Sequence, residues 1–322
     1  MALRPGTESM EDFPRFLALL EKARGLGPVT VSVAAAGDRD LLVGVQEAVE
    51  AGVARPVLVG DEGEVRRAAG EAGLAADTPV VAAADPREAA LGACRLVREG
   101  RAQVVMKGMV SSTDFLRAVL HPQHGLRAGR TLSHVAVYDV PGWDRLALMT
   151  DGGMIPAPDL SAKRDILQNA VDLARALGVA EPRVAVLSAT EIVDPAIPST
   201  VDAARLKEMA LSGEIQGAIV DGPLALDMAF SAEIAERKGM KSAVAGRADI
   251  FLVPCIEAGN ILGKAFMYLA GAAMAGVVMG GLAPAVLNSR VDTPVSRLSS
   301  LVVASLLVHA GAGRLREGGD ER

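Results

Sequence analysis

Five short apolar runs in this chain end in glycines and polar side chains, residue types that suit a binding site. In chain order these ends are Lys107–Gly108, Thr150–Gly153, Asp221–Pro223, Pro254–Asn260 and Ser289–Arg290. The apolar runs are typical of buried parallel strands, and parallel sheets bind ligands at the carboxyl ends of their strands. The sequence therefore predicts a ligand site at one edge of a parallel sheet.

The charge balance limits what such a site can bind. The 322 residues carry 33 Lys and Arg against 39 Asp and Glu, a formal net charge of −6. Nucleic-acid binding needs a basic surface, so we expect no nucleic-acid partner. An anionic ligand would have to be held by a local cluster of Arg, Lys and backbone N–H groups. The glycine-rich nucleotide loops and the G-x-S-x-G elbow are not found in the sequence.

Several of these polar residues also have a purely structural interpretation. Arg290 could cap a strand and pair with Asp292, and Asp221 before Gly-Pro could form a turn. Asp227 could be a charge that favours the dipole at a helix N-terminus. The sequence leaves both interpretations open for each of these four residues.

The same ambiguity holds for four further polar residues. Ser112 or Thr113 could cap the helix that follows, although a helix N-terminus is also an anion site. Lys264 could be a solvated charge or a contact to a ligand phosphate, and Lys107 is similar.

Strands and helices alternate along the whole chain, which predicts an α/β fold with a mostly parallel sheet. The apolar segment 265–288 is long enough to span a bilayer but is cut by glycines and Pro284. We interpret it as a helix over about 261–273, a buried strand over 275–280 and a short strand over 284–288, and expect no membrane span. A further helix over 199–213 should be capped by Ser199 or Thr200, and the last helix should start near Pro294.

Cysteine and histidine show no metal or disulfide pattern. Cys94 and Cys255 cannot make a disulfide framework, and the four histidines lack zinc-ligand spacing. Cys255 at a strand end is a conceivable nucleophile, whereas Cys94 is expected in the core. The first 25 residues lack the basic and apolar regions of a signal peptide. We expect no metal site and a reducing, cytoplasmic location.

Two motifs, taken together, point to a known family. The run "VDGPLALDMA" at 220–229 and the strand-end "SR" at 289–290 accompany "VVMKGMVSSTDFLRAVL" and "APAVLNSRVDTPVSRL". In these segments the chain resembles the phosphate acetyl/butyryltransferase family, and is most similar to its butyryltransferase forms. The resemblance covers roughly residues 15 to 310.

The resemblance implies an activity and an architecture. Family members move an acyl group between coenzyme A and inorganic phosphate, so acyl-CoA, phosphate and acyl phosphate would be the substrates and products, without a tightly bound cofactor. The fold would be two α/β domains around a cleft, like isocitrate and isopropylmalate dehydrogenases. Residues 1–145 with 286–322 would form the first domain and 146–285 the second. We expect a homodimer or a higher even oligomer, with 265–288 supplying the interface.

The resemblance also implies roles for single residues. Arg290 would grip phosphate with Arg117 beside it, aided by Ser112 and Thr113, because the guanidinium fork matches phosphate oxygens. Ser289 would stabilise the reacting centre. The acetyltransferases carry an acid seven residues after the serine, where this chain has Ser296. The base therefore stays open between Asp292, Asp227 and Asp221. Coenzyme A would be contacted by Lys107, Gly108, Asp221, Glu257, Asn260 and Lys264.

Four functions compete on the sequence. A butyryl-preferring phosphate acyltransferase fits the motifs, and a phosphate acetyltransferase is the near alternative. A non-catalytic acyl-CoA-binding module and a dehydrogenase on the same fold are alternatives of another class. A dehydrogenase would need an aspartate cluster for a divalent metal, which the sequence does not assemble.

Overall fold

The computed structural model describes residues 9–288 and 292–311 and divides the chain into two compact units. Unit 1 comprises residues 1–130 and 274–322, and unit 2 comprises residues 131–273. The first boundary lies earlier than the expected position after residue 145, and the second lies earlier than residue 286. That these units correspond to two domains stays a proposal.

Unit 1 contains a six-stranded sheet in the order β3-β2-β1-β4-β11-β10. All its strand pairs are parallel except β10 with β11. The strands are β1 (Val29–Ala34), β2 (Ala54–Gly60), β3 (Val80–Ala82), β4 (Val104–Lys107), β10 (Ala273–Met279) and β11 (Ala285–Val286). The helices are η1 (Met10–Asp12), α1 (Pro14–Leu26), α2 (Arg39–Glu50), α3 (Glu62–Glu71), α4 (Pro86–Arg98), α5 (Ser112–Val119) and α11 (Pro294–His309).

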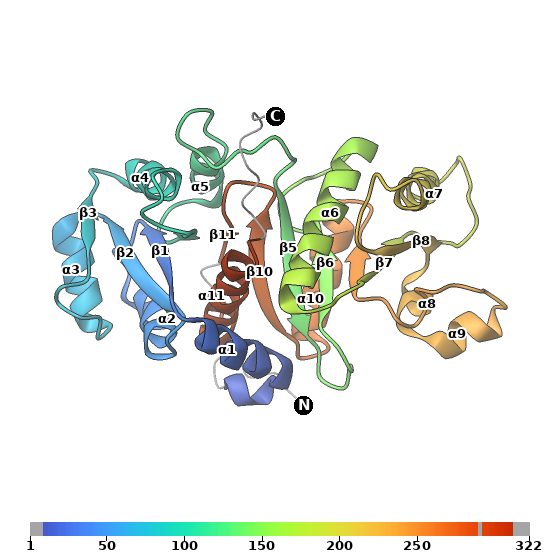
Figure 1. Cartoon of the computed structure of the whole chain (residues 1–322), viewed down its shortest axis with the longest axis horizontal. Coiled ribbons are helices and arrows are strands. Elements are labelled where there is room, and N and C mark those ends of the chain that lie inside the picture. The colour runs from blue at the N-terminus through green and yellow to red at the C-terminus, as the bar shows by residue number, and fades with distance from the viewer. Residues whose placement is uncertain (1–8, 289–291, 312–322) are drawn as a thin grey trace. The chain divides into compact units, whose positions relative to one another are not determined.

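Helices cover both faces of the unit 1 sheet (Figure 1). On one face α2 contacts α3 and α11, and α11 contacts α1; on the other face α4 contacts α5. The chain winds from β1 through β2 to β3, then returns through α4 to place β4 on the other side of β1. This reversal puts the helices on opposite faces and creates a topological switch point between β1 and β4.

Short acidic caps start the helices that follow the strands of unit 1. Asp38, Asp61 and Asp85 each accept backbone N–H bonds at the N-termini of α2, α3 and α4. Because each cap satisfies backbone donors that the helix itself leaves unpaired, the chain turns from strand to helix within a few residues.

Unit 2 contains a five-stranded sheet in the order β5-β6-β9-β7-β8, parallel except for β5 with β6. Helices α6 and α7 contact each other and the sheet, and α8 and α10 contact it on the other face (Figure 1). The strands are β5 (Ser133–Asp139), β6 (Ala147–Thr150), β7 (Arg183–Leu187), β8 (Ile219–Leu224) and β9 (Ile250–Leu252). The helices are α6 (Leu160–Leu177), α7 (Pro198–Leu211), α8 (Leu226–Phe230), α9 (Ala232–Arg237) and α10 (Ile256–Tyr268).

Both predicted helix caps are wrong. In α7 Pro198 occupies the first turn, which puts Ile197 at the N-cap without a side-chain bond and Ser199 and Thr200 inside the helix. Proline favours the first turn because its missing N–H has no intrahelical partner there. In α5 the cap is Ser111, one residue before the predicted Ser112 or Thr113.

Helix α10 begins and ends about five residues earlier than expected. Cys255 is extended and the helix follows it at once, and Gly271 has a positive φ of 70° that turns the chain into β10. The apolar residues 269–273 fit a helical pattern equally well, so the pattern alone could not locate this end.

The fold class is confirmed, since both sheets are mostly parallel and covered by helices. Aliphatic side chains dominate the core, and Phe16, Phe115 and Phe251 are aromatic side chains that are fully buried in it. Across residues 9–288 and 292–311, no helix combines the length and the apolar character needed to cross a bilayer. The segment 273–279 is the buried strand β10 instead.

Candidate active site

A pocket of about 150 Å³ opens at the switch point of unit 1. We call it the switch-point pocket; its polar lining residues are Asp38 and Asp40 after β1, Lys107 and Gly108 at the end of β4, Asn288 after β11, and Arg297 on α11. The parallel pairing of Val286 with Met106 explains why Asn288 and Gly108, each two residues further on, meet at one edge. The prediction that Lys107 and Gly108 lie at the carboxyl end of a strand is confirmed, since β4 ends at Lys107, and their role as coenzyme A contacts stays a prediction.

The floor of this pocket requires glycine at position 108. A Cβ on Gly108 would lie 2.3 Å from the carbonyl oxygen of Ala34 and 2.6 Å from that of Ala35. Ala35 itself has a positive φ of 52°, an uncommon conformation for a residue with a side chain. The ends of β1 and β4 therefore pack backbone against backbone, which holds Lys107 in a fixed position.

Lys107 brings a buried cation to the pocket. Its side chain is only 6% exposed, and its Nζ donates to the carbonyl of Gly108 over 3.4 Å. Arg297 adds a second cation and donates to the backbone carbonyl of Asp40 at 2.9 Å. Two carboxylates line the same pocket, but Asp38 caps α2 and Asp40 pairs with Arg39 at 3.1 Å. The pocket is thus lined by two cationic and two anionic side chains.

Asn288 and Asp292 form a buried polar pair beside the pocket. The Nδ2 of Asn288 donates to the Oδ2 of Asp292 at 3.1 Å, and both residues are at most 9% exposed. Ser300 lies at the edge of hydrogen-bond range from the same Nδ2, at 3.5 Å. Asp292, one of the three predicted bases, is therefore buried in unit 1 next to a pocket-lining residue.

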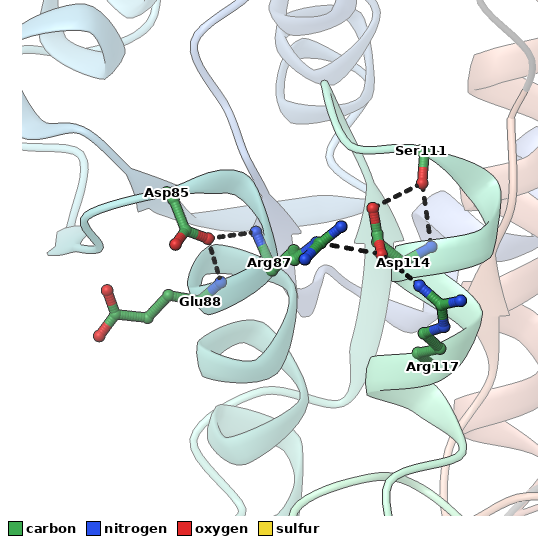
Figure 2. Close-up of polar contacts among 6 residues, drawn as sticks. All are labelled: Asp85, Arg87, Glu88, Ser111, Asp114 and Arg117. Atoms are coloured by element: carbon green, nitrogen blue, oxygen red, sulfur yellow. Dashed lines mark hydrogen bonds and ion pairs between the residues drawn. The ribbon is translucent and has the colours of Figure 1, made fainter.

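A second pocket, of about 380 Å³, lies where α4 and α5 begin. We call it the α4–α5 pocket; Asp85, Arg87, Ser111 and Asp114 line it, and Met109 belongs to both pockets. Figure 2 shows Asp114 between two guanidinium groups, with Arg87 Nε at 3.2 Å and Arg117 Nη1 at 3.0 Å from its Oδ1. Ser111 donates to the other carboxylate oxygen at 2.9 Å.

These contacts lower the pKa of the Asp114 carboxyl, with the Ser111 hydrogen bond as the largest cause and both arginines contributing. Asp114 therefore stays ionised and attracts both cations. Arg117, predicted to bind phosphate, is 70% exposed in its side chain and is engaged by this carboxylate. Ser112 and Thr113 lie exposed in the first turn of α5.

Two predicted bases lie in unit 2, each in an ion pair. Asp221 was expected after a strand but lies inside β8, and it accepts from Lys207 Nζ at 2.7 Å. Asp227 lies in the first turn of α8 and contacts Lys238 Nζ at 3.2 Å. The turn interpretation of Asp221 is wrong because the strand continues through Gly222 and Pro223 to Leu224. The helix-dipole interpretation of Asp227 agrees with its position.

The remaining predicted coenzyme A contacts share one helix in unit 2. Glu257, Asn260 and Lys264 are exposed on α10 and therefore accessible to a ligand. Ser289 and Arg290 lie outside the described residues, directly after Asn288 in the chain. The roles of all these residues stay predictions.

Sequence reasoning missed the partners that surround the predicted residues. Arg87 was not considered, although "DPRE" follows a strand and opens a helix, which is a common place for anion contacts. Asn288 belonged to the quoted "NSRVD" motif but was assigned no role, because a side chain's burial cannot be read from its type. Within the described residues, no group of three or more His, Cys, Asp or Glu could hold a metal ion.

The doubly wound sheet with a pocket at its switch point defines a class of α/β protein that binds ligands at the carboxyl ends of its strands. Comparison with known sequences narrows the class. The family described as "Phosphate acetyl/butaryl transferase" matches residues 78–304. The chain belongs to this family.

Two relatives and one solved structure illustrate the likeness. The phosphate butyryltransferase of Clostridium acetobutylicum is 42% identical over 293 residues, which cover 91% of this chain and 97% of the relative. The phosphate acetyltransferase of Rhizobium meliloti is 44% identical over 289 residues, covering 89% and 92%. The crystal structure of a branched-chain phosphotransacylase from Enterococcus faecalis V583 is 32% identical with a TM-score of 0.76, covering 87% of this chain and 99% of that one.

Proposed function

We propose that this protein is an enzyme that transfers a short acyl group between coenzyme A and inorganic phosphate. The observation that carries the proposal is the switch-point pocket, which buried Lys107 and Asn288 line. Asn288 directly precedes the Ser289–Arg290 pair in the sequence. Family membership supports the proposal, because this chain aligns with nearly the whole length of relatives named as phosphate butyryltransferase and phosphate acetyltransferase.

The reaction needs phosphate placed against a thioester carbonyl. An unprotonated oxygen of hydrogenphosphate forms the new bond to the acyl carbon while the carbon–sulfur bond breaks. The phosphate proton ends on the sulfur, so hydrogenphosphate and acyl-CoA yield acyl phosphate and the free thiol. Holding the two reactants in line supplies a large part of the rate acceleration, and cationic groups stabilise the charge on the phosphoryl oxygens.

The residue roles implied by the family remain part of this proposal. Arg290 grips phosphate and Ser289 stabilises the reacting centre, while Asp292, Asp227 or Asp221 accepts the thiol proton in the reverse direction. Arg117 is the second phosphate contact, and its Nη1 also pairs with Asp114. Lys107 and Gly108 face an anion in the switch-point pocket, either inorganic phosphate or a phosphate of coenzyme A.

Butyryl-CoA is the proposed substrate in preference to acetyl-CoA. The matching motifs are the butyryltransferase forms, and the chain is similar to relatives named for either acyl group. Two extra methylenes in an apolar pocket contribute about 1.6 kcal/mol by burial, so roughly tenfold discrimination in kcat/KM is expected. The protein is proposed to act in the cytoplasm as a homodimer or a higher even oligomer, without a tightly bound cofactor.

The decisive experiment measures thiol release with a disulfide reagent. We expect butyryl-CoA and phosphate together to release thiol, each reactant alone to release none, and acetyl-CoA to be turned over with lower kcat/KM. Arg290→Ala should lose more than about a hundredfold in kcat/KM, and Arg290→Lys should not recover it fully because lysine lacks the planar fork. Binding of butyryl-CoA without phosphate-dependent thiol release would identify the non-catalytic module instead.

A further inference from the structure

The amide oxygen of Asn288 is a buried hydrogen-bond acceptor without a partner among the residues that the structure describes. Asn288 is 6% exposed and lines the switch-point pocket. A buried polar atom of this kind costs free energy unless a ligand or water satisfies it. The unpaired oxygen therefore indicates a ligand that brings a hydrogen-bond donor.

The orientation of the amide is fixed by its other end. The Nδ2 donates to the Oδ2 of Asp292 at 3.1 Å, and a rotated amide would place two acceptor oxygens against each other. Ser300 also favours the nitrogen at this position, because its own hydroxyl already donates to the carbonyl of Ser296 at 2.8 Å. Rotating the amide toward Asp292 would therefore not give the oxygen of Asn288 a hydrogen-bond donor.

Two cationic side chains, Lys107 and Arg297, line the same pocket together with Asp38 and Asp40. An occupant that suits both features is an oxyanion that still carries a proton, since its charge matches the cations and its O–H matches the amide oxygen. Hydrogenphosphate has this chemistry at neutral pH, whereas sulfate has the same shape and charge but no proton to donate.

We propose that Asn288 accepts the hydrogen bond of the P–O–H group of inorganic phosphate and so selects phosphate against fully ionised oxyanions. This inference rests on the proposed function for the identity of the anion. With its protonated oxygen held at Asn288, the phosphate turns an unprotonated oxygen toward the acyl carbon. Asn288 is thus a binding and specificity residue, directly before the Ser289–Arg290 pair.

The test compares three anions on the full-length protein by titration calorimetry at pH 7.5. Phosphate and arsenate both carry an O–H group, and we expect both to bind about tenfold more tightly than sulfate, the scale of one buried hydrogen bond. In Asn288→Leu the phosphate affinity should fall to within about threefold of the sulfate affinity. The sulfate affinity itself should change less than about threefold. Sulfate binding as tightly as phosphate to the wild type would overturn the proposal.

A second variant keeps the test decisive if the leucine variant does not fold. Asn288→Ser retains a hydroxyl that can donate toward Asp292 but withdraws the amide oxygen, and it should also lose the discrimination. If discrimination persists in a folded variant, another acceptor such as Asp38 selects phosphate and the proposal fails. Thiol release from butyryl-CoA is measured in parallel on the wild type. Turnover without anion discrimination would refute only the role of Asn288, and discrimination without turnover would refute only the proposed reaction.

Discussion

At the scale of single residues, burial decides which charges can matter for binding. Lys107 is 6% exposed, whereas Lys241 in unit 2 is exposed to solvent. A buried ammonium has lost much of its hydration, so its interaction with an anion is weakened little by water and salt. Lys107 is for this reason a stronger candidate for anion binding than the exposed lysine of α10, Lys264.

Replacing Lys107 by methionine should weaken phosphate binding without destabilising the fold. Methionine has nearly the same length and requires no desolvation of a charge, so the melting temperature should not fall. We expect the KM for phosphate to rise about thirtyfold, from the loss of about 2 kcal/mol, with a smaller change in the KM for butyryl-CoA. Steady-state kinetics with Lys241→Met as the control measure both values. An effect on the KM for butyryl-CoA larger than that on the KM for phosphate would show that Lys107 contacts coenzyme A instead.

Cys94 should be chemically silent. Burial raises the pKa of its thiol to about 12, so the nucleophilic thiolate is scarcely populated at neutral pH. We expect Cys94→Ala and Cys255→Ala to retain most turnover, because phosphate attacks the thioester directly. A covalent acyl group found on either cysteine by mass spectrometry would contradict this mechanism.

The raised pKa of Cys94 also predicts how stability responds to alkali. In the unfolded chain the thiol loses its proton near pH 9, but in the native protein it keeps the proton up to about pH 12. The stabilisation is complete below pH 9 and is lost as the pH rises, by at most about 1.4 kcal/mol per pH unit. Urea unfolding between pH 8 and 10.5 should show a shallower loss in Cys94→Ala. Equal slopes in both proteins would show that the native thiol ionises normally.

At the scale of elements, the close approach of the chain after β4 to the end of β1 depends on the absence of a side chain at Gly108. Gly108→Ala would place a Cβ 2.3 Å from a backbone oxygen that cannot move without shifting β1. We expect it to destabilise unit 1 by about 2 kcal/mol and to reduce activity more than stability alone explains, because the pocket floor moves.

Gly70 is the matched control for this substitution. It lies exposed within α3, and an added Cβ would meet nothing within 4 Å. Gly70→Ala should therefore stabilise the protein by about 0.5–1 kcal/mol with unchanged kinetics. Denaturant unfolding and steady-state kinetics on both variants distinguish a packing effect from a general response to alanine.

Helices and strands were predictable from the sequence where the residues at their ends and the spacing of their apolar residues pointed to the same element. The helix over 160–177 has an apolar stripe and ends at Gly178 with a positive φ of 115°, so both its ends were visible in the sequence. The start of α7 was not, because Pro198 and Ser199 both favour a helix start and the tertiary structure chose between them. The site was predictable only in part, since neither the ion pairs of Asp221 and Asp227 nor the burial of Asn288 leaves a pattern in the chain.

At the scale of the whole molecule, α10 is an apolar helix with an uncovered surface. Its only buried residues are Gly259 and Gly263, while Ile261 is 69% and Tyr268 is 51% exposed. Leu269, directly after the helix, is 86% exposed. The predicted interface segment 265–288 is otherwise largely buried, so this surface at its beginning is what remains for a partner. Large apolar side chains exposed close together in the chain are often found at association sites.

We therefore expect the surface formed by Ile261, Tyr268 and Leu269 to be the contact between two copies of the chain. The double variant Ile261→Glu with Leu269→Glu should convert a dimer into a monomer, because two carboxylates would lose their hydration in the contact. Leu211→Glu is the control, since Leu211 is 81% exposed at the end of α7 and outside this surface. Light scattering after size exclusion gives the mass of each variant. If the folded double variant stays dimeric, the interface lies elsewhere. If the wild type is a monomer, the oligomeric state given under the proposed function is wrong.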